Sequence, residues 1–294
     1  MVTLERSPAL VERPEYVRPV EQALGDVEIS RQLSWPERVF RIDAVRQVSL
    51  LILLAAIWQI YAAAVSNPLV IPTFRDTIDA LWQGIVDGPI LLRAWTSLKL
   101  LAIGYAAGIA VATILTLAAI STRLGTDLLS LLTAMFNPLP AIALLPLALL
   151  WFGLGEKSLI FVLIHAVLWP LALNAYSGFL GVSTTLRLAG RSFGLKGPRY
   201  AFKLLIPAAF PTILTGLKIG WAFAWRTLIA AELVFGVSSG AGGLGWFIYE
   251  NRNQLEIASV FAGLLTVIVI GLLVESVIFR SIERITVRRW GMQQ

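Results

Sequence analysis

One serine and one histidine are the residues of this sequence that could perform nucleophilic catalysis. Gly236-Val-Ser238-Ser-Gly240 has the Gly-x-Ser-x-Gly spacing of a nucleophile elbow, and His165 is the only histidine that could serve as its base. Together they would make an intramembrane serine hydrolase, provided that His165 reaches Ser238 from a distant apolar segment. We retain this hydrolase as an alternative, which Ser238→Ala would abolish.

Two charged residues, Arg226 and Glu232, stand in a long apolar segment, where a charge is costly and often functional. The guanidinium of Arg226 could donate two parallel hydrogen bonds to an oxyanion such as nitrate, a sulfonate or a carboxylate. It could equally be a structural partner for a carboxylate or for backbone carbonyls. His165, Asn174 and Trp225 are further candidates for a solute pathway, although each could instead be a packing or helix–helix contact.

Composition argues against metal and nucleotide sites. There is no Cys and a single His, which excludes thiolate and multi-histidine metal centres. The nearest string to a P-loop, Gly155-Glu-Lys-Ser158, lacks the required Gly-x4-Gly-Lys-Ser/Thr spacing. Gly240-Ala-Gly-Gly-Leu-Gly245 has dinucleotide-site spacing, but apolar segments rather than a βαβ unit flank it. We therefore expect no metal, no cofactor and no ATPase site in this chain, and no nucleic-acid partner.

The overall composition indicates which elements must position these residues. Of the 294 residues, 57% are apolar and 14% are charged, whereas soluble domains are about 45–50% apolar and about 25% charged. A spanning helix needs about 20 mostly apolar residues, and no strand-like alternation recurs. The sequence therefore predicts an all-α membrane protein with six transmembrane helices, at residues 48–65, 95–120, 128–152, 158–180, 211–235 and 257–279.

The third predicted helix is interrupted by Pro138, Pro140 and Pro146. Prolines inside such helices are tolerated where neighbouring helices satisfy the freed carbonyls. We therefore expect this segment to be buried or to line a cavity. Two pairs of small residues, Gly104/Gly108 and Gly216/Gly220, would allow helices to approach closely.

Basic residues near the helix ends predict the orientation. If the N-terminus is cytoplasmic, thirteen of these residues lie inside and four lie outside, so both termini are expected to be cytoplasmic. Residues 1–46 would be a largely disordered cytoplasmic tail, 47–285 the six-helix transmembrane domain and 286–294 a second cytoplasmic tail. A helical pattern around residues 78–85 predicts a helix at the outer interface. The thirteen are Arg38, Arg41, Arg46, Arg123, Arg187, Arg191, Lys196, Arg199, Lys203, Arg280, Arg284, Arg288 and Arg289, and the four are Arg75, Arg93, Lys157 and Arg252.

The longest predicted cytoplasmic loop, residues 181–206, mixes basic and apolar side chains. Such a piece beside a membrane is suited to docking, either on anionic lipid or on another protein. Gly194 is expected to let two short helices meet at a sharp angle where a side chain would clash. Pro207 is expected to stop the second of them and to start the next spanning helix.

This loop resembles the EAA signature of ABC importer permeases, in which Glu-Ala-Ala is followed by a fixed Gly and by an Ile-x-Leu-Pro ending. Leu188-Ala-Gly190 stands in the place of Glu-Ala-Ala, Gly194 in that of the fixed Gly, and Leu204-Leu-Ile-Pro207 in that of the ending. Leu188 replaces the Glu, which puts in doubt any polar contact that the Glu would make. The predicted coupling residues are Leu188, Ala189, Gly190, Arg191, Gly194, Lys196, Leu204, Ile206 and Pro207.

Further stretches resemble the nitrate/sulfonate/taurine branch of these permeases, and the similarity extends over about residues 50–280. They are Asn137-Pro-Leu-Pro-Ala-Ile-Ala-Leu-Leu-Pro, Trp151-Phe-Gly-Leu-Gly-Glu-Lys-Ser158, Leu214-Thr-Gly-Leu-Lys-Ile-Gly220, Ala224-Trp-Arg-Thr-Leu-Ile-Ala-Ala-Glu232 and Ser239-Gly-Ala-Gly-Gly-Leu-Gly245.

The resemblance implies a type I ABC importer permease in a bacterial inner membrane, a transport subunit rather than an enzyme. It implies a small anionic solute of the nitrate, sulfonate, taurine or bicarbonate class. The implied partners are an ATPase subunit that holds ATP and Mg, an extracytoplasmic solute-binding protein, a second permease copy in a homodimer, and membrane lipid. An ATP-independent channel or secondary transporter would share the composition and is retained as an alternative.

Overall fold

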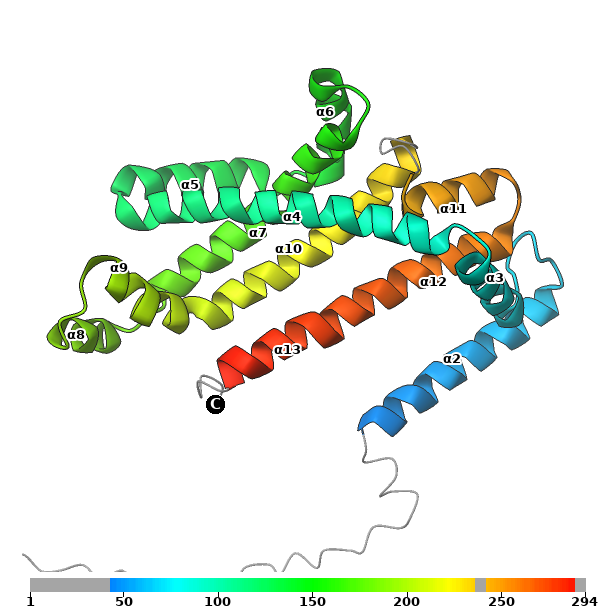
Figure 1. Ribbon diagram of the computed structural model, residues 1–294, viewed down its shortest axis with the longest axis horizontal. Coiled ribbons are helices and arrows are strands. Elements are labelled where there is room, and N and C mark those ends of the chain that lie inside the picture. The colour runs from blue at the N-terminus through cyan, green and yellow to red at the C-terminus, as the bar shows by residue number, and fades with distance from the viewer. Residues whose placement is uncertain (1–42, 236–241, 289–294) are drawn as a thin grey trace, which may run out of the picture. The chain divides into compact units, whose positions relative to one another are not determined.

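The computed structural model describes residues 43–235 and 242–288, and every regular element within these ranges is a helix (Figure 1). The all-α prediction is therefore confirmed. Several predicted features lie outside the described residues: nearly all of the N-terminal tail, Ser238 with its glycine-rich string, and most of the C-terminal tail.

Residues 1–54 and 55–294 form two units, which are described separately. Helix α2 (Asp43–Val65) begins in the first unit and ends in the second. It starts five residues before the predicted span, so residues 43–46 are helical. Beyond Arg46 the helix carries no charged side chain and is long enough to cross a bilayer.

Five helices of the described chain are long and apolar enough to span a membrane, and a bent pair makes up to six. The five are α2, α4 (Ile90–Ser121), α7 (Glu156–Leu180), the run 201–234 that includes η2 (Ala201–Leu205) and α10 (Ile206–Phe235), and the run 257–287 that includes α12 (Ile257–Leu273). The last run continues through η3 (Val274–Phe279), α13 (Arg280–Glu283) and η4 (Arg284–Arg288). The predicted membrane-spanning architecture is thus confirmed.

The third predicted span is broken at its prolines, as the sequence indicates, and is not one continuous helix. It consists of α5 (Arg123–Phe136), the short 3-10 turn η1 (Ala141–Leu144) and α6 (Leu145–Phe152), with a bend of 88° between its two halves. Pro138 and Pro140 have no N–H, so the helical ladder cannot continue through them. The Leu139 N–H bonds to the Phe136 carbonyl and closes a turn instead.

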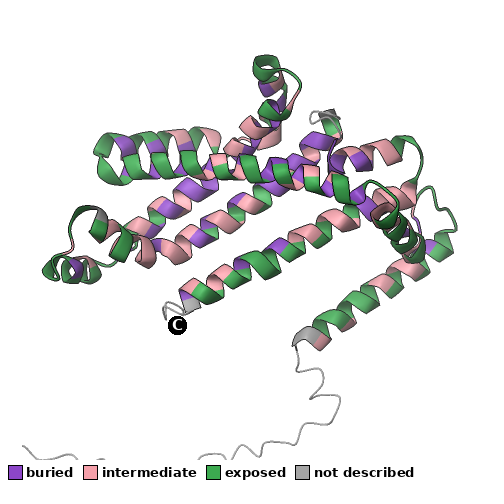
Figure 2. Cartoon of the chain, viewed as in Figure 1, coloured by how far each residue is buried: buried purple, intermediate pink, exposed green. Residues whose placement is uncertain are grey.

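Helix α7 is the most buried of the spans and packs chiefly against α4 and α10 (Figure 2). Both predicted glycine pairs contribute to this packing. A Cβ at Gly104 would meet Leu163 of α7, one at Gly108 would meet Val167, and one at Gly216 would meet Asn174. Because these positions of α4 and α10 are glycines, the two helices can approach α7 closely, as the sequence predicts.

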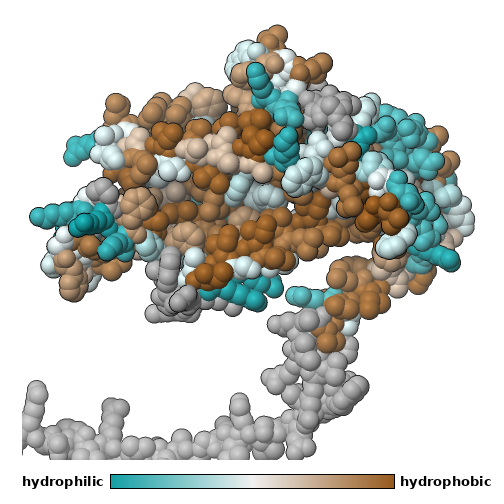
Figure 3. Space-filling model, viewed as in Figure 1, coloured by the Kyte–Doolittle hydropathy of each residue, from teal (hydrophilic) through white to brown (hydrophobic). Residues whose placement is uncertain are grey.

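Apolar side chains cover much of the second unit's outer surface (Figure 3). Ile114 of α4 and Leu150 of α6 are examples of large apolar residues that are exposed. A water-soluble protein would bury such residues, whereas lipid chains cover them in a bilayer.

Two short helices connect the spans on the predicted outer side. Helix α3 (Phe74–Val86) confirms the helical pattern expected around residues 78–85, and Thr73 and Asp76 form a capping box at its start. Helix α11 (Leu244–Asn253) follows the segment 236–241, which is outside the described residues.

Candidate functional site

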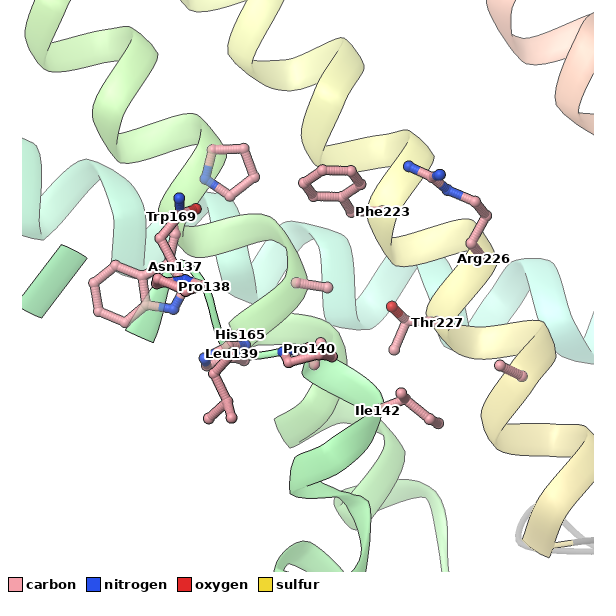
Figure 4. A pocket seen from close by; sticks show the side chains of 14 residues that line it. Asn137, Pro138, Leu139, Pro140, Ile142, His165, Trp169, Phe223, Arg226 and Thr227 are labelled. Atoms are coloured by element: carbon pink, nitrogen blue, oxygen red, sulfur yellow. The ribbon is translucent and has the colours of Figure 1, made fainter. Parts of the chain in front are cut away.

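A cavity of about 410 Å³ lies where the broken third span meets α7 and α10 (Figure 4). The break itself supplies Pro138 and Pro140, which confirms that the proline-rich segment lines a cavity. The other lining residues are Asn137, Leu139, Ala141 and Ile142 from the break, His165, Ala166, Trp169 and Pro170 from α7, and Phe223, Arg226, Thr227 and Ala230 from α10.

Arg226 is the charged residue of this cavity. Its Nε donates to the Ala222 carbonyl at 3.0 Å, and its guanidinium carbon lies 5.0 Å from the centre of the Phe223 ring. No carboxylate of the described chain pairs with it. The structure therefore places Arg226 in a cavity wall, without a carboxylate partner in the described chain but with the backbone-carbonyl contact that the sequence left open.

His165 and Trp169 lie one helical turn apart on α7 and share an aromatic cluster with Phe136 of α5. The ring centres of His165 and Trp169 are 5.9 Å apart, and Trp169 stacks on Phe136 at 5.7 Å and 12°. Both ring nitrogens of His165 and the indole nitrogen of Trp169 are buried and have no hydrogen-bond partner among the described residues. Trp169 was not predicted from the sequence, although its position four residues after His165 places both on one helix face.

Thr227 is a second cavity residue that the sequence analysis did not single out. Threonines in a helix commonly donate to the carbonyl four residues earlier. Many threonines of the described chain make this bond, but Thr227 does not. Its hydroxyl is therefore available to the cavity that Thr227 lines (Figure 4). The threonines that make this bond are Thr77, Thr96, Thr113, Thr126, Thr215, Thr266 and Thr286.

Two other predicted pathway residues do not line the cavity. Trp225 is buried, stacks on Trp221, and donates from its indole nitrogen to the Val267 carbonyl at 3.3 Å. Asn174 donates to the Pro170 carbonyl within its own helix at 2.7 Å. Both side chains therefore have local structural roles.

Glu232 also lies away from the cavity, in a closed polar cluster at the start of α11. Its side chain is 2% exposed and accepts from the Ser97 hydroxyl at 2.8 Å and from the Gly245 N–H at 2.9 Å. The Ser97 oxygen in turn accepts from the Leu244 N–H at 2.9 Å. A Cβ at Gly243 would collide with Glu232 and Ser97, so only glycine fits there. We call Ser97, Glu232, Leu244 and Gly245 the α11 clasp, because they tie the first N–H groups of α11 to α4 and α10.

The predicted coupling loop contains two short helices, α8 (Thr184–Ser192) and α9 (Gly197–Tyr200), and α9 runs on through η2 into α10. Gly194 has a φ of +76°, a left-handed backbone conformation that residues with a Cβ rarely adopt. Nothing lies within 4 Å of the position of a Cβ there. The expected clash is therefore wrong, and the backbone conformation is what requires glycine.

Pro207 does not stop a helix, which corrects a second expectation. It lies inside an uninterrupted helical run from Gly197 to Phe235. The preceding turn η2 is a π-helix, in which the Ile206 N–H bonds to the Ala201 carbonyl five residues earlier. This wider turn precedes the proline, whose ring would clash with a carbonyl in a regular α-helix.

The remaining coupling residues divide into an inner and an outer set. Gly190 is buried, and a Cβ at this position would collide with the side chain of Leu204. Glycine stands here in place of the second Ala of the EAA signature, and Leu204 occupies the space that the Ala side chain would need. Leu188 and Phe193 are exposed, Phe193 to 87%. Arg187 is used within the loop, donating to the Val182 and Phe179 carbonyls. Four other cations have no ion-pair partner in the described chain: Arg191, Lys196, Arg199 and Lys203.

Comparison with known proteins relates these features to a transport system. Residues 104–287 match the family described as binding-protein-dependent transport system inner membrane component. The chain is 33% identical to a putative ABC transporter permease protein of Methanocaldococcus jannaschii over 79% of this chain and 88% of the relative. It is 28% identical to the taurine transport system permease protein of Escherichia coli, over 84% and 90% of the two chains. It is also 28% identical to a nitrate import permease protein of Synechocystis, over 81% and 87%.

Proposed function

The chain belongs to the family of binding-protein-dependent transport system inner membrane components, and from this we propose that it passes a small oxyanion through the cavity beside Arg226. It is a multi-pass inner-membrane protein and a permease subunit of an ABC importer. The taurine and nitrate permeases among its relatives support an oxyanion as the solute.

One observation carries the choice of route. The cavity combines a helix break with a guanidinium that no carboxylate of the described chain neutralises. An uncompensated cation in an apolar span is unfavourable for folding alone. It is favourable where a passing anion accepts its hydrogen bonds.

The coupling loop supports a separate ATPase as the source of energy. Its exposed Phe193 and Leu188 offer apolar anchors, and four cations of residues 191–203 have no ion-pair partner in the described chain. Burying such side chains in a complementary cleft of another chain would stabilise the contact. ATP and Mg would be bound by that ATPase, and this chain would have no ATPase site of its own.

The remaining parts of the proposal concern assembly and orientation. An extracytoplasmic binding protein would deliver the solute, and a second copy of this permease would complete the pathway. Both termini and the coupling loop would face the cytoplasm, as the distribution of basic residues indicates. Lipid would cover the apolar outer surface.

Uptake by the reconstituted complex tests the proposal. The chain would be coexpressed with its ATPase and binding-protein partners, and uptake of the binding protein's ligand into vesicles would be measured. We expect ATP-dependent uptake of an oxyanion. A cationic ligand, or uptake without the ATPase, would contradict the proposal.

A matched pair of variants locates the route. Arg226→Gln removes the cavity's charge and should lower uptake about tenfold, as expected for the loss of a charge-assisted hydrogen bond. Arg252→Gln is the control, because Arg252 is exposed on α11 and does not line the cavity. Equal uptake by the two variants would assign Arg226 to structure.

A further inference from the structure

A second, polar cavity of about 440 Å³ lies between α3, α4, α11 and α12, and we call it the outer pocket. It shares no lining residue with the cavity beside Arg226. Seven of its twelve lining residues have polar or charged side chains, among them Asp87, Arg93 and Glu250. Hydrophilic side chains gather over α3 and α11, which lie on the predicted outer side (Figure 3). Such a lining suits water and polar groups rather than lipid chains.

The outer pocket exposes its carboxylates more than its cation. Arg93 Nη2 lies 3.1 Å from a carboxylate oxygen of Glu250, and the two side chains are 15% and 38% exposed, respectively. Asp87, at the end of α3, is exposed and has no ion-pair partner among the described residues. A partner that approaches from the outer side therefore meets Asp87 and Glu250 more readily than Arg93. The group that complements this surface is a cation.

Arg93 also adjoins the α11 clasp. It precedes Ser97 by about one turn of α4, so the two side chains share a face of that helix. A Cβ at Gly242 would lie 2.7 Å from Arg93 Nη1. At the next residue, Gly243, a Cβ would collide with Glu232 and Ser97. The charge of Arg93 also acts on the buried Glu232 carboxylate, so this one guanidinium neighbours a carboxylate of the outer pocket and a carboxylate of the clasp.

We propose that the outer pocket is the docking site for a basic side chain of the extracytoplasmic binding protein, and that Arg93 relays docking to α10. This inference rests on the proposed function and names the surface that its outer partner uses. A Lys or Arg of the binding protein pairs with Asp87 and competes with Arg93 for Glu250. Arg93 then interacts more strongly with Glu232 of the clasp.

Two further observations favour this partner and this relay. A second copy that docked through the same surface would set carboxylates against carboxylates, which disfavours a contact between copies here. Glu232 lies on α10 six residues after Arg226, and it accepts from the Gly245 N–H of α11 at 2.9 Å. Docking on α11 therefore reaches the helix that lines the solute cavity through buried hydrogen bonds.

Charge reversal at one residue tests the docking site. The assembled complex of permease and ATPase would be immobilised in lipid nanodiscs, and its affinity for its binding-protein partner would be measured by biolayer interferometry. Asp87→Lys should weaken this affinity about tenfold, because it sets like charges against each other. The fold should tolerate the change, because Asp87 is the C-cap residue of α3 and a cation suits a helix C-terminus.

Asp79→Lys is the matched control, since Asp79 is an exposed aspartate of the same helix that does not line the outer pocket. Its affinity should stay within about twofold of that of the unmodified chain. Added sodium chloride should weaken binding by the unmodified chain, and should weaken binding by Asp87→Lys less.

Arg93→Lys tests the relay separately from docking. Lys keeps the charge but lacks the planar fork that can face two carboxylates at once, so binding should stay within about twofold. Stimulation of ATP hydrolysis by the binding protein should nevertheless fall severalfold. If this variant does not fold, Glu250→Gln replaces it and should lower both the affinity and the stimulation.

Several results would overturn the inference. Equal affinities of Asp87→Lys and Asp79→Lys would remove the docking site, and so would a loss of permease dimers in Asp87→Lys with binding unchanged, which would assign the outer pocket to a contact between copies. Full stimulation in a folded Arg93→Lys would remove the relay. If uptake of an oxyanion still requires the binding protein and Arg226 in these cases, the proposed function stands. Uptake that needs no binding protein would instead remove the proposed function.

Discussion

The α11 clasp and the cavity both place polar side chains among apolar helices, but they satisfy them differently. In the clasp, the Ser97 hydroxyl donates to the buried Glu232 carboxylate, which also accepts from the Gly245 N–H, and the Ser97 oxygen accepts from the Leu244 N–H. Beside the cavity, the buried nitrogens of His165 and Trp169 have no hydrogen-bond partner in the described chain.

This difference in hydrogen bonding distinguishes polar groups with a structural role from polar groups with a functional one. A buried polar group with all its bonds made inside the chain stabilises one arrangement of helices. A polar group left without a partner beside a cavity costs stability unless something else supplies the partner. Glu232 therefore belongs to the first kind, and the ring nitrogens of His165 and Trp169 belong to the second.

The largest effect is expected at the centre of the clasp. Glu232→Ala leaves Ser97 and the Gly245 N–H without their acceptor and opens a cavity, which together should destabilise the fold by about 3–5 kcal/mol. The thermal midpoint and the yield of folded protein should both fall. Glu275→Ala is the control, since Glu275 is exposed and should tolerate the change. Normal stability of Glu232→Ala would remove the contrast between the two regions.

The second-largest effect is expected in the coupling loop, which belongs neither to the α11 clasp nor to the cavity. Gly194→Val places a β-branched residue at a φ of +76°, which costs about 1–3 kcal/mol and distorts the loop. Transport and stimulated ATP hydrolysis should be lost, while membrane insertion persists. Gly194→Asn should retain much of both activities, because Asn tolerates this conformation. Equal loss in both variants would point to packing, which the open space around this position does not predict.

The third prediction removes one hydroxyl from each region. Ser97→Ala should lower stability by about 1–3 kcal/mol, because the Leu244 N–H and Glu232 lose a partner. Thr227→Val keeps shape and should change stability by less than about 0.5 kcal/mol, yet lower uptake severalfold. Thermal unfolding and vesicle uptake measure the two effects. The reverse pattern would show that the two regions have been assigned the wrong way round.

The smallest effect is expected for an ion pair outside both regions. Lys218 of α10 and Glu283 of α13 are 2.7 Å apart and partly exposed. Lys218→Met should therefore lower stability by at most about 1 kcal/mol and leave uptake intact. The exchange Lys218→Glu with Glu283→Lys should restore part of that stability in a double-mutant cycle. A loss comparable to that of Glu232→Ala would mean that this pair, too, is essential.

Apolar length and glycine spacing predicted most of the fold. The spanning helices, the packing of Gly104 and Gly108 on α7, and a cavity beside the prolines were all expected. The 88° bend was not, because hydropathy does not distinguish a straight span from two helices joined by a turn. Pro207 was misinterpreted because a π-helical turn has no clear sequence signature.

The candidate site was predicted in part. Arg226 and His165 were chosen for residue type, and the cavity contains both. Glu232 was chosen on the same ground but lies in the clasp, because its partners Ser97 and Gly245 are distant in sequence. Trp169 was missed because a tryptophan in an apolar helix looks like a packing residue until its N–H is found without an acceptor.

The chain contains no cysteine, so a single introduced thiol can report whether solute-sized anions reach the cavity. The measurement is the rate at which an anionic methanethiosulfonate modifies Thr227→Cys in the assembled transporter, with and without ATP turnover, against Ser97→Cys in the clasp. We expect Thr227→Cys to react, turnover to change its rate and added solute to slow it, while Ser97→Cys stays unmodified. An unreactive Thr227→Cys, or equal reaction at both positions, would contradict this expectation.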